Sequence, residues 1–499
     1  MDYEPVIGLE VHAQLLTKSK MFCGCSASYA DAPPNTHVCP ICLGMPGVLP
    51  VINKRAVDFT IMTALALSCE IPAFTKFDRK NYPYPDLMKG YQISQYDAPI
   101  GVKGCLTLEV NGVQKRTGIT RVHLEEDVAK LLHRTDWSAD INVCGTESYS
   151  LVDVNRSGVP LMEIVGEPDL RSPEEARQYL IKLRSILQFL GVSTGNMEEG
   201  SFRCDANVSI RPIGSHKYLT KVEIKNMNSF RAVYRALDYE VERQKRVLEE
   251  GGTLEQETRG WVEERGVTVS QRSKEYAHDY RYFPEPDLPP LAVSREWVEQ
   301  IRTQLPELPE ARRDRFMVEY QLPRYDADLL VSEKVRADYF EACLKAGGPL
   351  KGEAMSSQAK AISNWLLGDF ARMLNVTGTD LRQISQSKLP PQNLAEMIEL
   401  LDKGVISGKT AKDVFEEMFN TGKTASQIVK ERGLTQISDT AEVEAVIDKV
   451  IANNAQAVSD FKAGKQQALA FLVGQVMKET RGRANPKLVN EVLLSKLGG

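Results

Sequence analysis

The feature that most restricts the fold of this chain is an alternation of apolar and polar residues in several short segments. Residues 6–16 read VIGLEVHAQLL, in which every second side chain is apolar. The same alternation recurs at residues 119–127, 202–211 and 221–225. Successive side chains of a strand point to opposite faces. These segments therefore predict a curved antiparallel sheet with one apolar and one polar face.

Two amphipathic segments supply helices that can cover the apolar face. Residues 172–191 open with Ser172 as N-cap and Pro173 at the first helical position, and Glu175 completes the pattern of a capping box. Residues 229–252 repeat the scheme, with leucine, valine and aromatic residues three and four positions apart. The fold class expected for this part of the chain is α+β.

Length and proline content divide the chain. A chain of 499 residues is expected to form about three domains. Prolines cluster between positions 284 and 309, and beyond them the apolar residues follow a helical period. We predict a catalytic α+β domain at residues 1–292, a helical domain at 293–405 and a helical tail at 406–499.

The polar face of the predicted sheet has an unusual composition. Solvated strand faces favour Lys, Glu and Thr, whereas here acids alternate with His, Asn and Arg. Acids beside a histidine suit a divalent ion such as magnesium, and neighbouring Arg and Lys suit phosphates. For any single strand, a polar side that merely faces water is the better explanation, but it accounts less well for the residue types of the four strands together. The residues concerned are Glu10, His12, Gln14, Arg121, His123, Glu125, Asp127, Arg203, Asp205, Asn207, Ser209, Arg211, Lys221, Glu223 and Lys225.

Four cysteines form two close pairs near the start of the chain. Cys23 and Cys25 are separated by one residue, Cys39 and Cys42 by two, and thirteen residues lie between the pairs. This is close to the spacing of a tetrahedral zinc site, and four thiolates would make that site structural. The alternative is four unrelated thiols. The other cysteines stand singly and form no disulfide framework: Cys69, Cys105, Cys144, Cys204 and Cys343.

The start of the chain and the length of its apolar runs indicate in which cellular compartment the protein is expected. The chain opens MDYEP without an apolar run, so we expect no signal peptide and a reducing, cytoplasmic setting. No apolar run approaches the ~20 residues that span a bilayer, so no membrane partner is expected. From Phe461 onward there are seven Lys and Arg but two Asp and Glu, which predicts a basic tail.

Seven blocks in register resemble the B subunit of the glutamyl/aspartyl-tRNA amidotransferases (GatB). The blocks span the first domain, and residues 461–486 resemble the YqeY-type module found at the end of that family. Met88 and Gln271 depart from the usual proline and methionine, and neither lies at a predicted ligand. The blocks are IGLEVHAQL (7–15), YPDLMKGYQISQYD (84–97), HLEEDVAK (123–130), VDVNRSGVPLMEIV (152–165), RCDANVS (203–209), KVEIKNMNSF (221–230) and RSKEYAHDYRYFPEPDL (272–288).

The resemblance implies a glutamine synthetase-like catalytic fold and a carbon–nitrogen ligase with glutamine as amido donor. Such an enzyme uses ATP and Mg²⁺ to phosphorylate the side-chain carboxylate of misacylated Glu-tRNA(Gln) or Asp-tRNA(Asn), and ammonia then displaces the phosphate. The expected partners are an amidase A subunit, a small C subunit and the tRNA. Zn²⁺ at the paired cysteines is frequent in the family.

The resemblance also implies roles for individual residues. The predicted catalytic and magnesium-binding residues are Glu10, His12 and Glu125, with Glu126 and Asp127 as weaker candidates. Those for nucleotide or substrate binding are Arg203, Asp205, Asn207, Glu223 and Lys225. Those where ammonia enters are Lys80, Asp86 and Lys89, although each lysine is as well explained by a structural salt bridge. Independently of the resemblance, four basic residues of the tail lie on or beside a probable helix end and are expected to pair with tRNA phosphates: Lys478, Arg481, Arg483 and Lys487.

A second function class stays open on the residues alone, namely a zinc-braced RNA-binding protein whose sheet is a passive platform. It explains the cysteines and the basic tail but leaves the Glu and His strand faces unexplained. The sequence shows no cysteine or serine in the setting of an amidase nucleophile. We therefore expect the ammonia-producing reaction to belong to a partner.

Overall fold

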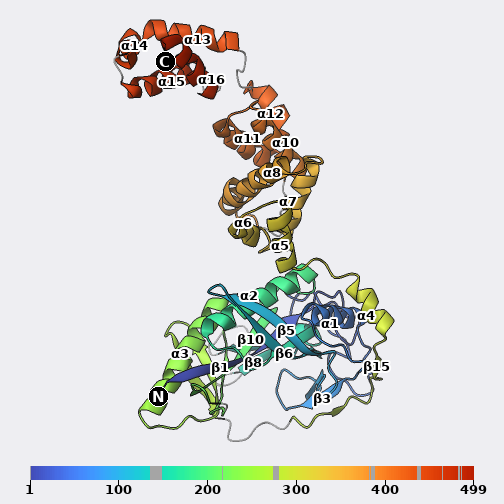
Figure 1. Ribbon diagram of the computed structural model, residues 1–499. Helices are drawn as coiled ribbons and strands as arrows, with labels where there is room; N and C mark the ends of the chain where they lie inside the picture. The colour runs from blue at the N-terminus through green and yellow to red at the C-terminus, as the bar shows by residue number, and fades with distance from the viewer. Residues whose placement is uncertain are drawn as a thin grey trace. The chain divides into compact units, whose positions relative to one another are not determined.

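The computed structural model of the chain (Figure 1) describes residues 2–134, 149–215, 217–273, 280–380, 383, 388–434, 440–462, 465–480, 484 and 486–498. Two compact units divide it, Met1–Leu308 and Pro309–Gly499. The first unit contains the strands and the second contains helices. The fold is α+β, as the sequence predicts.

An eight-stranded open sheet forms the centre of the first unit, in the order β13-β12-β11-β10-β1-β9-β6-β5. Its neighbouring strands are antiparallel except β11 and β12, which run parallel. The expected antiparallel pairing therefore holds except at this one pair, which is parallel because α3 connects β11 to β12 as a crossover. The strands are β1 (Tyr3–Gln14), β5 (Gly101–Val110), β6 (Val113–Glu126), β9 (Pro160–Gly166), β10 (Phe202–Pro212), β11 (Val222–Lys225), β12 (Glu257–Val262) and β13 (Val267–Ser273).

Three helices cover the apolar face of this sheet: α1 (Lys54–Ala66), α2 (Pro173–Leu190) and α3 (Phe230–Glu249). The predicted caps of α2 and α3 are confirmed, since Ser172 Oγ and Ser229 Oγ accept from backbone N–H groups three residues on. The Glu175 carboxylate accepts from the Arg171 N–H at 2.6 Å, one residue before the position that a capping box requires.

Smaller sheets lie beside the large one. In the first of them, β3 (Asp78–Asn81) pairs with both β4 (Tyr91–Ser94) and β14 (Phe283–Pro284). Contacts between β4 and β6 place this small sheet against the large one. The other two pairs are β2 (Phe74–Thr75) with β15 (Leu291–Ala292), and β7 (Lys130–Arg134) with β8 (Tyr149–Asp153). A 3₁₀ turn, η1 (Val154–Arg156), follows β8.

The first unit continues past the predicted boundary at residue 292. Helix α4 (Arg295–Arg302) lies on α1, where Trp297 Nε1 donates to Asp58 at 2.8 Å. Ile301 is buried in the core that the sheet and its helices share. The sequence missed this attachment because a short amphipathic helix gives no sign of the surface that it covers. The three-domain division stays a prediction.

The secondary-structure elements described in the second unit are all helices. The last four helices share a buried apolar cluster of their own, which joins Val443, Leu472 and Leu493. Predicted tail residues Arg481 and Arg483, like Cys144 in the first unit, lie outside the described residues. The helices are α5 (Pro309–Glu319), α6 (Arg324–Leu330), α7 (Lys334–Ala346), α8 (Glu353–Trp365), the π-helix η2 (Leu366–Phe370), α9 (Ala371–Thr377), α10 (Pro391–Asp402), α11 (Gly408–Thr421), α12 (Ala425–Arg432), α13 (Thr440–Asn453), α14 (Ala455–Lys462), α15 (Gln466–Glu479) and α16 (Pro486–Leu497).

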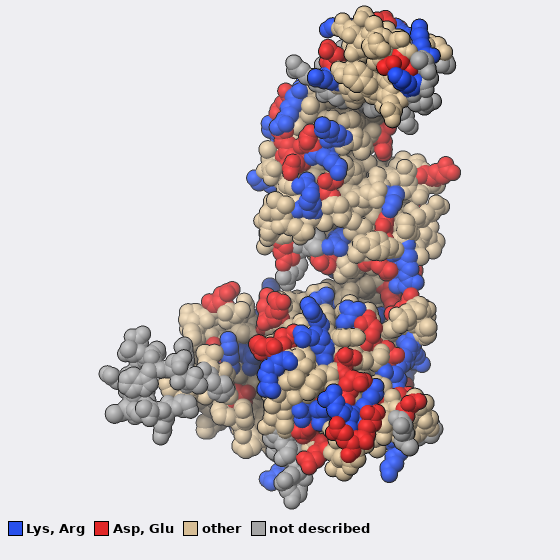
Figure 2. All heavy atoms as spheres, turned by 90° about the vertical axis from the view of Figure 1, so that its left-hand side faces the viewer, with Lys and Arg blue, Asp and Glu red and all other residues tan. Residues whose placement is uncertain are grey.

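The surface of the protein carries charged side chains of both signs. On the face in Figure 2, Lys and Arg lie interspersed with Asp and Glu. Within the described residues, no helix is both long and apolar enough to cross a lipid bilayer.

Candidate functional site

The polar face of the sheet brings the sequence-predicted acids and cations into neighbouring rows. His12 of β1 lies opposite Glu163 of β9 and Arg203 of β10, and Glu163 lies opposite His123 of β6. One residue pair along, Glu10 lies opposite Asp205. Cross-strand side chains on one face are neighbours in a sheet, so segments about 200 residues apart in sequence share one surface.

Three of these side chains form a compact group of metal-ligating atoms. His12 Nε2 lies 3.5 Å from Glu125 Oε1 and 3.6 Å from Glu163 Oε2. One ligand atom from each residue fits within a mutual separation of 4.8 Å. The structure thus joins His12 and Glu125 as expected and adds Glu163. Glu10 is not part of this group.

Electrostatics favour the ionised form of Glu163 in this group. Burial raises the pKa of Glu163, but the imidazoles of His123 and His12 outweigh burial and hold it well below its usual range. For His12, burial lowers the pKa while the carboxylates of Glu163 and Glu125 raise it, and the net result is about 8. Without a metal, the His12 imidazolium therefore balances the carboxylates, as a divalent ion would.

The second row of the face holds Glu10 among groups suited to phosphate and ribose. Asn207 Nδ2 donates to Glu10 Oε1 at 2.8 Å, and Lys225 Nζ lies 2.8 Å from Asp205 Oδ2 and 3.3 Å from Glu223 Oε1. Burial, then the carboxylates of Glu163 and Asp205, raise the pKa of Glu10. A cation that entered beside Glu10 would relieve this repulsion.

Asp127 and Arg203 form a fixed ion pair next to the metal-ligating group. Arg203 Nη2 donates to Asp127 Oδ2 at 2.9 Å, and Gln14 Nε2 donates to the same oxygen at 2.7 Å. Burial raises the pKa of Asp127, but the guanidiniums of Arg203 and Arg156 bring it below its usual value. Asp127 thus orients Arg203, whose side chain remains 37% exposed.

The residues expected where ammonia enters occupy different settings. Lys89 pairs with Glu126, whose Oε1 also accepts from the Ile93 N–H at 3.0 Å. Asp86 Oδ1 is buried without a partner among the described residues. Burial lowers the pKa of Lys80, but the charges of Glu125, Tyr282 and Glu163 outweigh burial and raise it.

A cavity of about 310 Å³ opens at the Glu10 end of the face. Its walls are mainly apolar, with Val6, Val165, Pro168 and Leu219, and Gly8 forms part of its floor. The lining side chains that carry polar groups are Glu10, Asn207, Ser209, Tyr218 and Lys221. An apolar slot with a few polar groups at one end is typical of a site for a planar heterocycle joined to a charged group.

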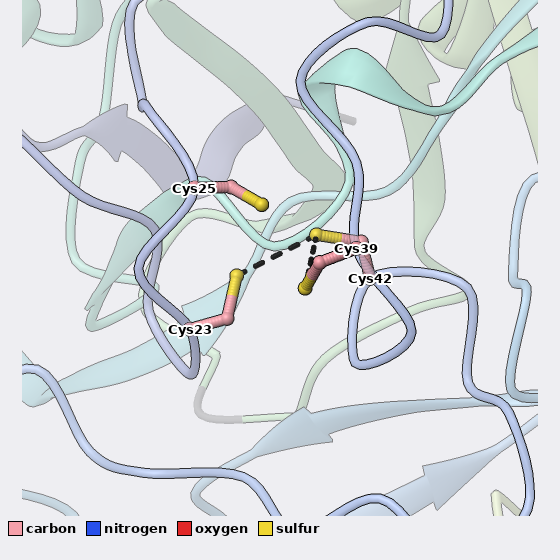
Figure 3. Close-up of side chains that lie close together, drawn as sticks. All are labelled: Cys23, Cys25, Cys39 and Cys42. Atoms are coloured by element: carbon pink, nitrogen blue, oxygen red, sulfur yellow. Dashed lines mark hydrogen bonds between the residues drawn. The ribbon is translucent and has the colours of Figure 1, made fainter.

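The four paired cysteines meet in space (Figure 3). Cys42 Sγ lies 3.5 Å from Cys23 Sγ and 3.7 Å from Cys39 Sγ, and all four sulfurs lie within 4.8 Å of one another. A zinc–sulfur bond of about 2.3 Å gives a tetrahedron with edges of about 3.8 Å. The sulfurs therefore fit a tetrahedral zinc with little adjustment.

The surroundings of the cysteines support a thiolate site. A hydrogen bond with Cys23 lowers the pKa of Cys42 to about 4. Burial opposes this shift, and the Lys20 ammonium adds to it. Lys20 is 1% exposed, and its Nζ lies 3.5 Å from Cys42 Sγ. Cys42 also contacts Ala129, two residues beyond Asp127. The cysteines therefore pack against the segment that follows Glu125, and a metal held by all four thiolates would have no open position for chemistry.

Sequence reasoning missed Glu163 because β9 reads PLMEIV, which is apolar apart from this one acid and shows no alternation. Residues 160–164 of this strand are buried on both faces. A single acid inside such a run was the available signal, since an ionised side chain is buried only when it is paired or bound to a metal.

The tail residues expected to bind tRNA are described in part. Lys478 lies in the last turn of α15. Of Lys487, only its backbone position in α16 is described.

Comparisons with known proteins identify the family of this chain. Residues 5–299 match the family described as the GatB/GatE catalytic domain, and residues 338–497 match the GatB domain. The chain is 56% identical over 495 residues to the B subunit of the aspartyl/glutamyl-tRNA(Asn/Gln) amidotransferase of Dehalococcoides mccartyi strain CBDB1, covering 99% of each chain. The corresponding proteins of Carboxydothermus hydrogenoformans (over 496 residues, 99% of each chain) and Moorella thermoacetica (over 498 residues, 100% of each) are also 56% identical. The chain therefore belongs to the B-subunit family of the aspartyl/glutamyl-tRNA amidotransferases.

Proposed function

We propose that this chain amidates glutamate or aspartate misacylated on tRNA, by first phosphorylating the side-chain carboxylate with ATP. The observation that carries the proposal is the group formed by His12, Glu125 and Glu163, with Arg203 on the adjoining strand β10 and Lys225 on the next strand, β11. A carboxylate oxygen of the substrate attacks the γ-phosphorus and ADP leaves. Ammonia then forms the C–N bond, and the phosphate departs with that oxygen.

The donor set fits a magnesium ion that is shared with ATP. Magnesium takes oxygen ligands from one or two carboxylates, keeps several waters and binds substrate phosphates. Glu125 and Glu163 supply the carboxylates, and His12 supplies a nitrogen once its proton is lost. A magnesium ion held there would neutralise charge on the γ-phosphate.

The cations of the site would hold the phosphates, while the cavity would hold the base. Arg203 is fixed by Asp127, so its guanidinium can meet a phosphate without reorganising. Lys225 lies on β11, two strands from β1, and is 39% exposed. The cavity beside Glu10 has the walls and the volume for adenine, with Asn207 and Glu10 at its polar end.

The proposed function is tested by ATP turnover. The chain with its partner subunits should hydrolyse ATP when misacylated tRNA is present and should not do so with correctly charged tRNA. A zinc-braced RNA-binding protein, the alternative that the sequence left open, would bind both tRNAs and hydrolyse no ATP.

Nitrogen donors provide a further prediction, because the chain would rely on a partner amidase and a small C subunit for ammonia. Given misacylated tRNA and ATP, the isolated chain should amidate slowly with a high ammonium concentration and not at all with glutamine. Chromatography of the released amino acids measures the product. Glutamine hydrolysis by the pure chain would contradict the division of labour.

The basic tail leads to a prediction on tRNA affinity. The apolar cluster of the last four helices includes Val443 and Ile447 of α13, so a cut at Phe461 would divide it. A chain that ends before Thr440 loses the whole cluster together with Lys478. It should bind tRNA more weakly, with a shallower salt dependence, because each lost lysine–phosphate contact removes about one unit from the log–log slope.

The truncated chain should bind ATP with unchanged affinity, because the nucleotide site lies in the first unit. A filter-binding titration from low to high salt measures the slope. Equal tRNA affinity of both forms at every salt concentration would show that the tail is an exposed basic surface without this partner.

A further inference from the structure

Four tyrosines gather beside the metal-ligating group and are not explained by packing. They come from the ends of the small sheet: Tyr82 follows β3, Tyr96 follows β4, and Tyr280 and Tyr282 precede β14. Tyr96 and Tyr282 are stacked, with ring centroids 4.3 Å apart and planes 10° apart. Tyr280 meets Tyr282 edge-on at 6.1 Å.

The stack is open to solvent on one side. Tyr282 covers one face of the Tyr96 ring, yet Tyr96 is 56% exposed, so its other face is accessible. Rings that serve a core are buried, whereas an exposed ring backed by a second ring offers a flat, rigid surface. Such surfaces bind nucleic-acid bases by stacking.

The stack lies next to the proposed chemistry. Gln95, the residue before Tyr96, accepts through its Oε1 from the Leu124 N–H at 3.0 Å, and Ser94 Oγ donates to Glu125 Oε2 at 3.2 Å, so the segment that carries Tyr96 lies against the strand that carries Glu125. Lys80 Nζ lies 5.1 Å from the centroid of the Tyr280 ring. The platform formed by the Tyr96–Tyr282 stack thus combines an open aromatic face with the Lys80 ammonium group, which suits a phosphate or ribose oxygen.

We infer that the open face of Tyr96 stacks on the terminal 3′ adenine of the misacylated tRNA. The inference rests on the proposed function, in which the amino acid is esterified to the ribose of that adenosine. Its side-chain carboxylate lies only a few bonds from the ribose and must reach the group of His12, Glu125 and Glu163. The base must therefore bind beside that group.

The adenine of ATP is the other candidate for this platform, and the geometry disfavours it. The cavity at the Glu10 end of the face already offers an apolar slot for one adenine, bounded by residues of β1, β9 and β10. The tyrosines lie on the other side of the group, near Glu125 on β6. Two adenosines enter the reaction, and the structure provides two separate surfaces for them.

The test uses a tRNA whose 3′-terminal base is 2-aminopurine, because the fluorescence of this base falls when it stacks. Binding to the full-length chain should quench the probe, and Tyr96→Ala should abolish most of the quenching. Tyr96→Phe keeps the ring and should restore it. Tyr234 lies on α3 and is 36% exposed, so Tyr234→Ala is the control for loss of an exposed tyrosine. This variant should quench the probe as the wild type does.

Kinetics of the complete complex separate the outcomes. Tyr96→Ala should raise KM for misacylated tRNA about five- to a hundredfold, the usual effect of losing one base–aromatic stack, and leave KM for ATP unchanged. The inference would be overturned if the 2-aminopurine probe were quenched normally by the Tyr96→Ala variant. It would also be overturned if KM rose for ATP or ammonium instead of for misacylated tRNA. Failure of the proposed function is distinguishable, because the wild-type complex would then show no tRNA-dependent ATP turnover while the quenching result still stands.

Discussion

Replacing Glu125 by glutamine should lower tRNA-dependent ATP turnover by about a thousandfold. The side chain is 3% exposed, and its Oε1 lies 3.5 Å from His12 Nε2 in the metal-ligating group. A carboxamide removes one of the two carboxylates that offset the charge of the ion. The stabilisation of transition-state charge by a metal amounts to several kcal/mol, and about 4 kcal/mol corresponds to that loss of rate.

The graded effects of neighbouring substitutions follow from the same geometry. Glu163→Gln should match Glu125→Gln, His12→Ala should be less severe, and Glu10→Gln should be milder because Glu10 lies outside the group. Glu4→Gln is the control, since Glu4 pairs with Arg211 near the start of β1 and should leave turnover within about twofold. Near-normal turnover of Glu125→Gln and His12→Ala at limiting magnesium would contradict the metal assignment.

Replacing Cys39 by serine should lower zinc content and stability together. Four thiolates at tetrahedral spacing make zinc binding part of the folding free energy, so loss of one ligand should cost several kcal/mol of unfolding free energy. Elemental analysis should find about one zinc per wild-type chain and little in the variant, and calorimetry should show a lower Tm for the first unit.

Cys105→Ser is the matched control, because Cys105 is a partly exposed thiol on β5 away from the cluster. It should keep both zinc and Tm. Wild-type protein that contains no zinc in any preparation would contradict the assignment of the four thiols to a metal.

Local features of this fold were predictable from the sequence, whereas its long-range partners were not. Alternation in β1 and β10 reports which side chains face the core, and the serine caps of α2 and α3 follow from short-range hydrogen bonding. The parallel pairing of β11 with β12 and the attachment of α4 depend on contacts between distant segments. No local pattern encodes them.

The candidate site divides in the same way. His12 and Glu125 were predictable because their strands alternate polar and apolar residues. The cysteine site was predictable because its four cysteines occur in two close pairs. Glu163 was hidden in an apolar run because β9 lies between β1 and β6 and is buried on both faces. The cavity beside Glu10 depends on the sheet order, which brings β9 and β10 to either side of β1.

The central claim is that the chain phosphorylates the side-chain carboxylate of the misacylated amino acid. The direct measurement uses tRNA(Gln) charged with glutamate that carries ¹⁸O in its side-chain carboxylate, together with ATP and ammonium. The account predicts that one labelled oxygen appears in the inorganic phosphate for each glutaminyl-tRNA formed. Formation of glutaminyl-tRNA with phosphate that carries no ¹⁸O would contradict it.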